Sequence, residues 1–484
     1  MAYGAMAGRV AGERPAVLIS GASVAGPALA YWLGRYGFRP TVVEVAPALR
    51  GGGFAVDFRG AAQLDVLARM GVLGEIRRSG TGGGPMHFID DQGRQLASLP
   101  PEFAGGDVEI LRSELSRILY ERSLCGGGLY GHGLYEHGSC GRSLNEHGPY
   151  GAAAGAAAPG APPVTEYLFG DSVTSLTESE DGVRVTFERG APRTFDLVVG
   201  ADGLHSTVRR LAFGPEERFV SHLGYYVAGW DLPAAAPGGG VPADGVPVDG
   251  MPGGGVRGLA DRPVGYGEPG RLMSAGRTAR RTGEAGYAGE AFCVFAAAEL
   301  TYDRRAPTAQ KKLIAQAYAG AGWRTPELIE TLWGARDLYF DAISRVDVPR
   351  WSAGRTVLLG DAAYGATVGG MGTGSAIVGA YVLAGELAAA GGDHRAAFAR
   401  YERRLRPYVT RCQEGGRGVG EFLAPATREA MAARNAALND PVAVAAMLAQ
   451  GQDLAADIVL EDYPARCGGV APSVTDGGGS IRGA

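Results

Sequence analysis

Lysine, cysteine and unbroken apolar segments are all scarce in this chain of 484 residues. The five cysteines, at positions 125, 140, 293, 412 and 467, show no framework spacing, so they predict no disulfide scaffold and favour a reducing cytoplasm. No segment near the start combines a basic stretch with an apolar one, and no signal peptide is expected. The net charge of -5 argues against a general affinity for nucleic acid.

The longest apolar segment, residues 372–391, is interrupted by Glu386. It overlaps a glycine-rich loop, so we expect a buried helix here and no membrane span. A hydrophobic content of 46% is ample for a core, and the length allows two or three domains. The sequence does not indicate an oligomeric state.

Three short loops are the most informative feature that is present. Each follows an apolar run of strand type and carries small residues. One such loop is weak evidence, because an ordinary turn between a strand and a helix has the same pattern. Three of them, far apart in the chain, predict a long dinucleotide contacted along its length, and FAD fits this best. The loops are residues 21–26, 200–203 and 360–363.

The first loop is predicted to hold a pyrophosphate. It joins an apolar strand, residues 16–20, to a helix that begins near Pro27, so backbone amides and the helix dipole face one point. Glu44 ends the next strand, 23 residues after Gly21, and is predicted to accept hydrogen bonds from a ribose, which excludes a 2′-phosphate there. The predicted binding residues of the loop itself are Gly21, Ser23, Val24, Ala25 and Gly26.

The second and third loops each place an aspartate after a strand, at 195–200 and at 355–360. A further glycine-rich stretch, 369–374, precedes the long apolar helix. Amides at the start of that helix would stabilise the negative charge of a reduced flavin. The predicted contacts in these stretches are Asp202, Gly203, Gly360, Asp361, Gly372 and Thr373.

With these motifs the chain resembles the class A flavoprotein monooxygenases of the para-hydroxybenzoate hydroxylase fold, and among them the tetracycline-hydroxylase-like branch. The resemblance covers about residues 15–124, 164–230 and 290–410. It implies that Asp361 binds the ribityl chain of FAD, that Asp202 and Gly203 lie near the pyrophosphate, and that Arg112 reaches the flavin side. The alternative for Arg112 is a solvated helix arginine. Asp361 could also be a helix N-cap, which does not exclude its role at the cofactor.

The expected fold class is α/β. A Rossmann-like FAD-binding domain of the GR2 type, residues 15–215 with 345–395, would be joined to a mostly antiparallel substrate domain, residues 216–344, and to a C-terminal helical tail, residues 396–484. Residues 125–163 read as a low-complexity insert and a disordered surface loop, and their histidines and cysteines lack rigid metal-ligand spacing, so no metal is expected. A mobile loop is expected at 234–270.

The resemblance also implies the chemistry. NAD(P)H would bind transiently and reduce FAD, O2 would add at the flavin C4a position, and the hydroperoxide would hydroxylate an aromatic or polycyclic small molecule of secondary metabolism or antibiotic modification. No second Rossmann fingerprint is present, which fits a transient nicotinamide cofactor. No catalytic side chain is assigned, because the protein must mainly position the substrate and exclude water.

Two departures from the family pattern keep other interpretations open. Val45 stands where an arginine usually follows the ribose-binding glutamate, leaving Arg50 to supply the contact, and the loop after Tyr364 lacks the usual proline, so a non-catalytic or reductase-type FAD protein is the main alternative. A plain NAD-dependent dehydrogenase would use only the first loop. A flavin halogenase needs a lysine near the flavin, but the only lysines, Lys311 and Lys312, lie in an expected surface helix, and the chain has no Trp-x-Trp pair.

Overall fold

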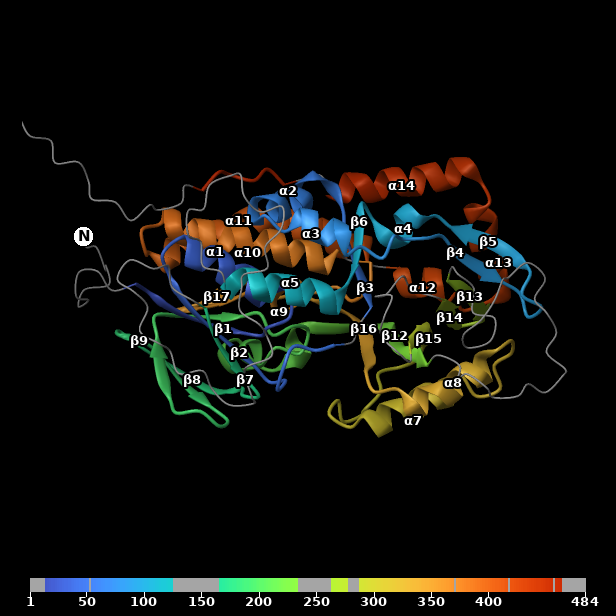
Figure 1. The fold of residues 1–484 in the computed structure, drawn as a ribbon, viewed down its shortest axis with the longest axis horizontal. Helices are drawn as coiled ribbons and strands as arrows, with labels where there is room; N and C mark the ends of the chain where they lie inside the picture. The colour runs from blue at the N-terminus through green and yellow to red at the C-terminus, as the bar shows by residue number, and fades with distance from the viewer. Residues whose placement is uncertain are drawn as a thin grey trace, which may run out of the picture.

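The computed structural model of the chain describes residues 14–51, 54–124, 165–233, 263–276, 287–369, 371–416, 418–455 and 458–463. Two large sheets lie at opposite ends of an elongated molecule, with helices along one side (Figure 1). The insert expected at 125–163 lies outside the described residues, as do residues 234–262 of the loop expected at 234–270.

The first sheet has six strands. Its strand β1 (Ala16–Ser20) pairs in parallel with β11 (Leu197–Gly200) and with β2 (Arg39–Glu44). β18 (Thr356–Leu358) and β7 (Glu166–Phe169) continue the parallel arrangement outward, and the short β17 (Ser352–Ala353) is antiparallel to β18. β1, β11 and β18 are buried along their whole length, which explains their continuous apolar sequences. The predicted α/β fold with a Rossmann-like sheet is confirmed.

The register of this sheet brings the three loops together. Ser20 at the end of β1 pairs with Gly200 at the end of β11, and Gly200 pairs with Leu358 at the end of β18. Because the strands are parallel, the segments that follow them leave from one edge of the sheet. Loops that are far apart in the sequence therefore start side by side.

Helices cover this sheet on the side where α1, α10 and α11 lie together in Figure 1. α1 (Ala25–Arg35) packs against α5 (Arg112–Leu124) and α10 (Gly372–Ala389), and α10 packs against α2 (Gly60–Met70) and α11 (His394–Gly415). Small residues allow the close approach: a Cβ added at Gly374 of α10 would overlap the side chain of the buried Gln63 on α2.

By length and composition α10 could cross a membrane, but 83% of it is buried inside the protein. Glu386 of α10 is only 2% exposed and pairs with Arg400 at 2.6 Å and with Arg404 at 2.7 Å on α11. The hydroxyl of Tyr463 donates a further hydrogen bond to Glu386 at 2.8 Å. A charge held in this way belongs to a packed protein interior, and the prediction of a buried helix is confirmed.

The second sheet has seven strands in the order β16-β12-β15-β14-β13-β4-β5. All neighbouring pairs are antiparallel except β13 and β4. The strands are β4 (Met86–Ile89), β5 (Gln95–Leu99), β12 (Val220–Pro233), β13 (Val264–Glu268), β14 (Arg271–Gly276), β15 (Tyr287–Ala296) and β16 (Leu338–Val346). The predicted mostly antiparallel sheet is therefore confirmed.

Alternate residues of β12 face opposite sides of this sheet, as the strand period of two requires. Tyr226, Ala228 and Trp230 pack with α7 (Pro307–Ala317) and α8 (Thr325–Gly334). Tyr225 and Val227 belong to a second cluster, which includes residues of α12 (Val419–Leu423) and α13 (Arg428–Leu438). This second side of the sheet is the one that faces the nucleotide-binding loops.

The two sheets are not made from separate stretches of the chain. β4 and β5 come from residues 86–99, inside the range assigned from the sequence to the FAD-binding part, yet they extend the seven-stranded sheet. These strands are four and five residues long, and β4 joins the sheet through a parallel pair with the distant β13. Such a long-range pairing leaves no local pattern in the sequence.

The C-terminal tail is helical, as expected, and spans both halves of the molecule (Figure 1). α12 packs on β12 and β15, α13 packs on β5, and α14 (Pro441–Ala455) packs on α2 and α4 (Pro101–Gly105). The remaining elements are α3 (Leu73–Arg78), β3 (Ala55–Phe58), β6 (Val108–Leu111), β8 (Val173–Ser179), β9 (Gly182–Phe187), β10 (Arg193–Phe195), α6 (Thr207–Ala212), the 3-10 helix η1 (Glu216–Arg218) and α9 (Asp361–Tyr364).

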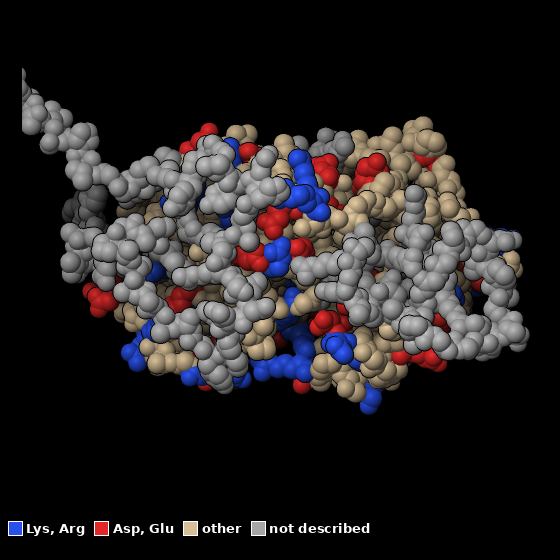
Figure 2. Space-filling view, in the orientation of Figure 1, with Lys and Arg blue, Asp and Glu red and all other residues tan. Residues whose placement is uncertain are grey.

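Figure 2 shows that acidic and basic side chains of the described residues are interspersed on this face of the molecule. Arg117 of α5 illustrates the mixing: it pairs with Glu75 at 3.0 Å, with Glu114 at 2.8 Å and with Glu121 at 2.6 Å. The described part of this face therefore offers no continuous surface of one sign to a polyanion.

Candidate FAD-binding site

The first loop is closed tightly against the second. The backbone of Gly21 has a φ of +105°, and a Cβ there would overlap the carbonyl oxygen of Ala201 in the second loop. A Cβ at Gly26 would overlap the carbonyl oxygen of Gly21 itself. Both positions therefore require glycine, and the loop forms a compact cradle ahead of α1 with backbone close to any bound group. Val24 and Ala25 are buried in its wall.

Glu44 lies at the end of β2 beside this loop, and its carboxylate stabilises the loop by hydrogen bonds. One carboxylate oxygen accepts a hydrogen bond from the amide of Ala22 at 2.9 Å, and the other accepts one from the amide of Ala46 at 3.0 Å. Each carboxylate oxygen can accept a second hydrogen bond. Arg50 reaches Glu44 only at 3.9 Å, and its side chain is 75% exposed, so it makes a weak surface ion pair.

Asp202 in the second loop is partly buried, and its side chain stabilises the loop itself. Its carboxylate accepts hydrogen bonds from the hydroxyls of Ser20 and Ser206 and from the amide of Val208. Burial raises the pKa of Asp202, and these hydrogen bonds oppose the rise. Gly203, with a φ of +79°, has open space where a side chain would be. On this side of the turn the backbone is therefore accessible to a ligand.

Arg209 connects the second and third loops, a role that the sequence pattern did not reveal. Its side chain is fully buried and donates a hydrogen bond to the carbonyl oxygen of Ala362 at 3.0 Å and another to that of Leu204 at 2.5 Å. The only sequence signal for it is the arginine seven residues after Asp202. Two loops that supply separate predicted contacts are in this way held as one unit.

Asp361 is the first residue of α9, and Gly360, with a φ of +65°, precedes it as the cap. The N-cap alternative for Asp361 is therefore wrong. Burial raises the pKa of Asp361, while nearby Arg112 opposes that rise. Among the residues that the structure describes, no side chain or amide donates a hydrogen bond to this carboxylate. A partly buried carboxylate without such a donor is suited to accept hydrogen bonds from a bound hydroxyl.

Arg112 and the start of α10 complete the arrangement around Asp361. Arg112 begins α5, and its Nε donates a hydrogen bond to the hydroxyl of Ser23 in the first loop at 3.3 Å. A Cβ added at Gly372 would lie 3.0 Å from Oδ1 of Asp361, so the amides of Gly372 and Thr373 begin α10 next to that carboxylate. Residues from four distant segments therefore meet at one place. The interpretation of Arg112 as a merely solvated arginine does not fit this contact.

The loop from Gly365 to Met371 is held without the proline that the family pattern would supply. The carbonyl oxygen of Gly365 accepts a hydrogen bond from the amide of Val346 at 2.8 Å, and the amide of Thr367 donates one to Ser344 at 3.0 Å, so the loop extends β16. Val368 and Met371 have φ values of +60° and +50°. A left-handed conformation is rare for a β-branched residue and stores strain beside the site.

An aromatic group lines the seven-stranded sheet where it faces these loops. The ring of Phe54 lies 5.2 Å from that of Phe292 on β15 and 5.1 Å from that of Tyr339 on β16. A Cβ at Gly229 of β12 would overlap the Phe54 ring. Burial raises the pKa of Tyr339, which also senses the charges of Asp341, Arg112 and Asp361. These aromatic residues were not identified from the sequence, because nothing local indicates which alternate strand positions face the cofactor.

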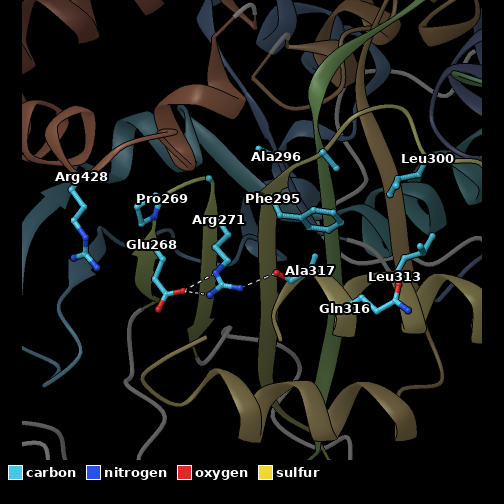
Figure 3. A pocket seen from close by; sticks show the side chains of 12 residues that line it. Glu268, Pro269, Arg271, Phe295, Ala296, Leu300, Leu313, Gln316, Ala317 and Arg428 are labelled. Atoms are coloured by element: carbon cyan, nitrogen blue, oxygen red, sulfur yellow. Dashed lines mark hydrogen bonds and ion pairs between the residues drawn. The ribbon is translucent and has the colours of Figure 1, made fainter. Parts of the chain in front are cut away.

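A cavity of 820 Å³ lies elsewhere, beside α7 (Figure 3). It is bordered by the ion pair of Glu268 and Arg271, and Arg271 also donates a hydrogen bond to the carbonyl oxygen of Ala317 at 3.0 Å. Phe295 lines it and belongs to the side of the sheet opposite Phe292. None of the residues of the three loops lines this cavity, so it is separate from the candidate FAD site.

Comparison with known proteins agrees with this geometry. No family model matches the chain. An uncharacterized protein of Mycobacterium tuberculosis (strain CDC 1551 / Oshkosh) is 39% identical, over 82% of this chain and 91% of the relative. A flavin-dependent monooxygenase from an unknown prokaryotic organism is 32% identical, over 87% of this chain and 94% of the relative. The chain belongs to the flavin-dependent monooxygenases.

Solved structures place this monooxygenase within the family. The tetracycline destructase Tet(51) superposes with a TM-score of 0.70 at 27% identity, over 93% of this chain and 100% of that one. The HpxO protein of Klebsiella pneumoniae, solved with FAD and uric acid, gives a TM-score of 0.58 at 19% identity, over 90% of this chain and 96% of that one, which shows a shared fold. The predicted class A FAD-dependent monooxygenase of the tetracycline-hydroxylase-like branch is confirmed, and with it an oxidoreductase that uses FAD.

Proposed function

We propose that this monooxygenase holds FAD along its three loops and uses NAD(P)H and O2 to hydroxylate an aromatic or polycyclic small molecule. The observation that carries the proposal is the meeting of Ser23, Arg112 and Asp361, which come from three distant segments and surround one point at the edge of the six-stranded sheet. An ordinary turn between a strand and a helix would need none of these contacts.

The residues present fit FAD. The loop has no space for a side chain at Gly21 or Gly26, so its backbone amides can closely approach a pyrophosphate. Glu44 keeps acceptor capacity for a ribose. Asp361 is a partly buried acceptor for which the described residues supply no donor, and ribityl hydroxyls would supply one. We therefore assign the predicted site residues the roles proposed from the sequence, with Gly203 offering backbone near the pyrophosphate.

When bound, FAD supplies the redox chemistry that no side chain can provide. The residues of this chain would bind the cofactor, orient the substrate and exclude water from both. The amides of Gly372 and Thr373, at the start of an 18-residue helix, would stabilise negative charge on the reduced flavin ring. Phe54, Phe292 and Tyr339 would hold a flat aromatic substrate by ring contacts, and the Val368 loop would keep water from that face.

Two observations support a polycyclic aromatic substrate. The aromatic group on the second sheet suits a large flat molecule. Two structural neighbours above 25% identity are named tetracycline destructases, Tet(51) and Tet(55). These two names support the proposed role in antibiotic modification or secondary metabolism.

The proposal is tested with purified protein. Its visible spectrum should show bound flavin, and denaturation should release FAD and not FMN. Tetracycline, as a polycyclic probe, should accelerate the oxidation of NADH or NADPH and gain one oxygen atom by mass spectrometry. Asp361→Ala protein is the matched control and should lose the flavin signal. Protein that binds no FAD under any loading condition would overturn the site assignment.

The same assay separates the main alternative, a reductase-type FAD protein. The strained, proline-free loop at Val368 is the observation that favours it. NAD(P)H oxidation that is unaffected by a panel of polycyclic aromatics, and that yields only hydrogen peroxide, would support the alternative against the proposed hydroxylation.

A further inference from the structure

His205 joins the two halves of the molecule through both of its ring nitrogens. It stands in the turn after Gly203, two residues before the start of α6. Its Nδ1 lies 3.0 Å from Oε1 of Glu216, and its Nε2 lies 3.1 Å from Oδ1 of Asp341. Glu216 lies in η1 just before β12, and Asp341 lies on β16, so both partners lead into the seven-stranded sheet.

The geometry requires a charged imidazole. A neutral histidine has one N–H donor and one lone pair, and here each nitrogen faces a carboxylate oxygen, which can only accept while ionised. One of the two contacts would then set a lone pair against a carboxylate. Only the doubly protonated ring donates to both Glu216 and Asp341.

Asp341 depends on His205 for a cationic partner more than Glu216 does. Glu216 also pairs with Arg304 at 3.0 Å and with Arg209 at 3.4 Å. Among the described residues, His205 is the only cationic side chain within hydrogen-bond distance of Asp341, whose other contact is the amide of Ala342 at 2.8 Å. The ionisable groups facing this cluster from the neighbouring elements are Arg209 of α6, Arg304 and Tyr302 before α7, Tyr226 of β12, Tyr339 of β16, Asp361 of α9 and Arg112 of α5.

We propose that protonated His205 is a positioning residue: it links the turn that contains Asp202 to β16. This link holds Tyr339 of β16 against the FAD site, and it is lost as the pH rises and His205 loses its proton. Tyr339 and Asp341 are two residues apart on β16 and therefore point to the same side of the sheet. Asp341 also repels the carboxylate of Asp361 electrostatically. Loss of the proton leaves the Asp341 charge without a cationic partner beside the cofactor position.

The pH window follows from the direction of the shift. Burial lowers the pKa of His205, but the hydrogen bonds that its ring donates to Asp341 and Glu216 outweigh this effect and raise the pKa above its usual 6.5. A raised folded-state pKa contributes stability that is fully present below 6.5 and is lost as the pH passes the raised value. Although burial raises it, His205 and Arg304 lower the pKa of Glu216 to about 2, so Glu216 stays ionised throughout this window.

The first test observes the proton directly and needs no FAD. The chain has seven histidines, so NMR of protein labelled at the histidine Cε1 carbon resolves few signals, and His205→Gln identifies the one from His205. We expect its titration midpoint above 6.5 in the wild-type protein and a lower midpoint in Asp341→Asn, which removes one of the two carboxylates. A midpoint at or below 6.5, or one unmoved by Asp341→Asn, overturns the proposed link.

The second test measures the consequence at the cofactor and rests on the proposed FAD site. Wild-type affinity for FAD should fall on the order of threefold to tenfold between about pH 6 and pH 9, as one nearby charge is lost. His205→Gln should bind FAD with the weak high-pH affinity throughout. His222→Gln is the matched control, because His222 contacts a backbone carbonyl at 3.0 Å and should keep the wild-type profile.

The two tests fail separately. An unchanged pH profile of FAD affinity in His205→Gln contradicts the proposed link while leaving the FAD site intact. If no variant binds FAD, the proposed function fails, whereas the NMR titration still decides whether His205 is held between the two carboxylates. If His205→Gln does not fold, Asp341→Asn provides both readouts with His205 in place.

Discussion

The six-stranded sheet and the seven-stranded sheet meet at one site but specify it in different ways. On the first sheet the site is backbone: glycines that admit no Cβ, amides at helix starts, and carboxylates fastened to their own loops. On the second sheet it is side chains: the rings of Phe292 on β15 and Tyr339 on β16 pack against Phe54. The part of the site on the six-stranded sheet is therefore determined by local backbone geometry. The part on the seven-stranded sheet is determined by which rings face the site. In the proposed function, the substrate could thus change while the cofactor-binding loops stay the same.

The largest effect is expected from Gly26→Ala. The added methyl would overlap the carbonyl oxygen of Gly21, and backbone in a closed loop has little room to move. We expect destabilisation of about 3 kcal/mol or more together with loss of FAD, measured by urea unfolding and flavin absorbance. Gly451→Ala is the control, because a Cβ at Gly451 of α14 meets nothing and an alanine should be neutral or favour the helix. Equal stability of the two variants would show that the first loop is looser than its geometry indicates.

Next come Asp361→Ala and Arg112→Ala. Each removes a charged hydrogen-bonding group from the proposed flavin side, so FAD binding should weaken by about 1.5–3 kcal/mol, while the melting temperature of the FAD-free protein changes little. Titration of stripped protein with FAD measures the loss. Arg94→Ala is the control, since Arg94 pairs with Asp90 in an exposed turn. Wild-type FAD affinity in both variants would mean that the cofactor lies elsewhere.

A smaller effect is expected from Gly229→Ala, which makes the comparison between the sheets direct. Here the added methyl meets the Phe54 ring, and a side chain can turn aside where a backbone carbonyl cannot. We expect a loss of about 1–3 kcal/mol in stability with FAD retained, and a changed preference among polycyclic substrates. Flavin content and a substrate panel measure the two outcomes. Loss of FAD in this variant would show that the two sheets do not divide their tasks as proposed.

The smallest effect is expected from replacing residues 125–163 with a short Gly-Ser turn. The hydroxyl of Thr165 donates a hydrogen bond to the carbonyl oxygen of Ser123 at 3.0 Å, so the chain on either side of this segment is already close. A short connection can therefore close the gap at little cost. FAD content and melting temperature should remain nearly unchanged. Failure of the shortened protein to fold would assign this segment a structural role.

The sequence predicted the six-stranded sheet and the three loops at its edge because their signals are local. Glycines, an aspartate after a strand and a glutamate at the next strand tip each follow from chain geometry at one point, and parallel register then collects them. Arg209 was not recognised as a link, since its partners are carbonyl oxygens that leave no sequence pattern. β4 and β5 belong to the seven-stranded sheet through long-range pairing, which the local sequence does not indicate. The contact of Phe54 with Tyr339 depends on which side of each strand faces the site, and this also could not be derived from local residues.

The carboxylates of Glu44 and Asp202 are already occupied by the protein's own amides and hydroxyls, and this has a thermodynamic consequence. The cradle is preorganised, so little chain has to be ordered when the cofactor arrives. If FAD binds here as proposed, and only to the folded chain, a free FAD concentration about 100 times the dissociation constant stabilises the folded state by about 2.7 kcal/mol. The melting temperature should then rise with the concentration of free FAD, and the FAD-free protein should remain folded.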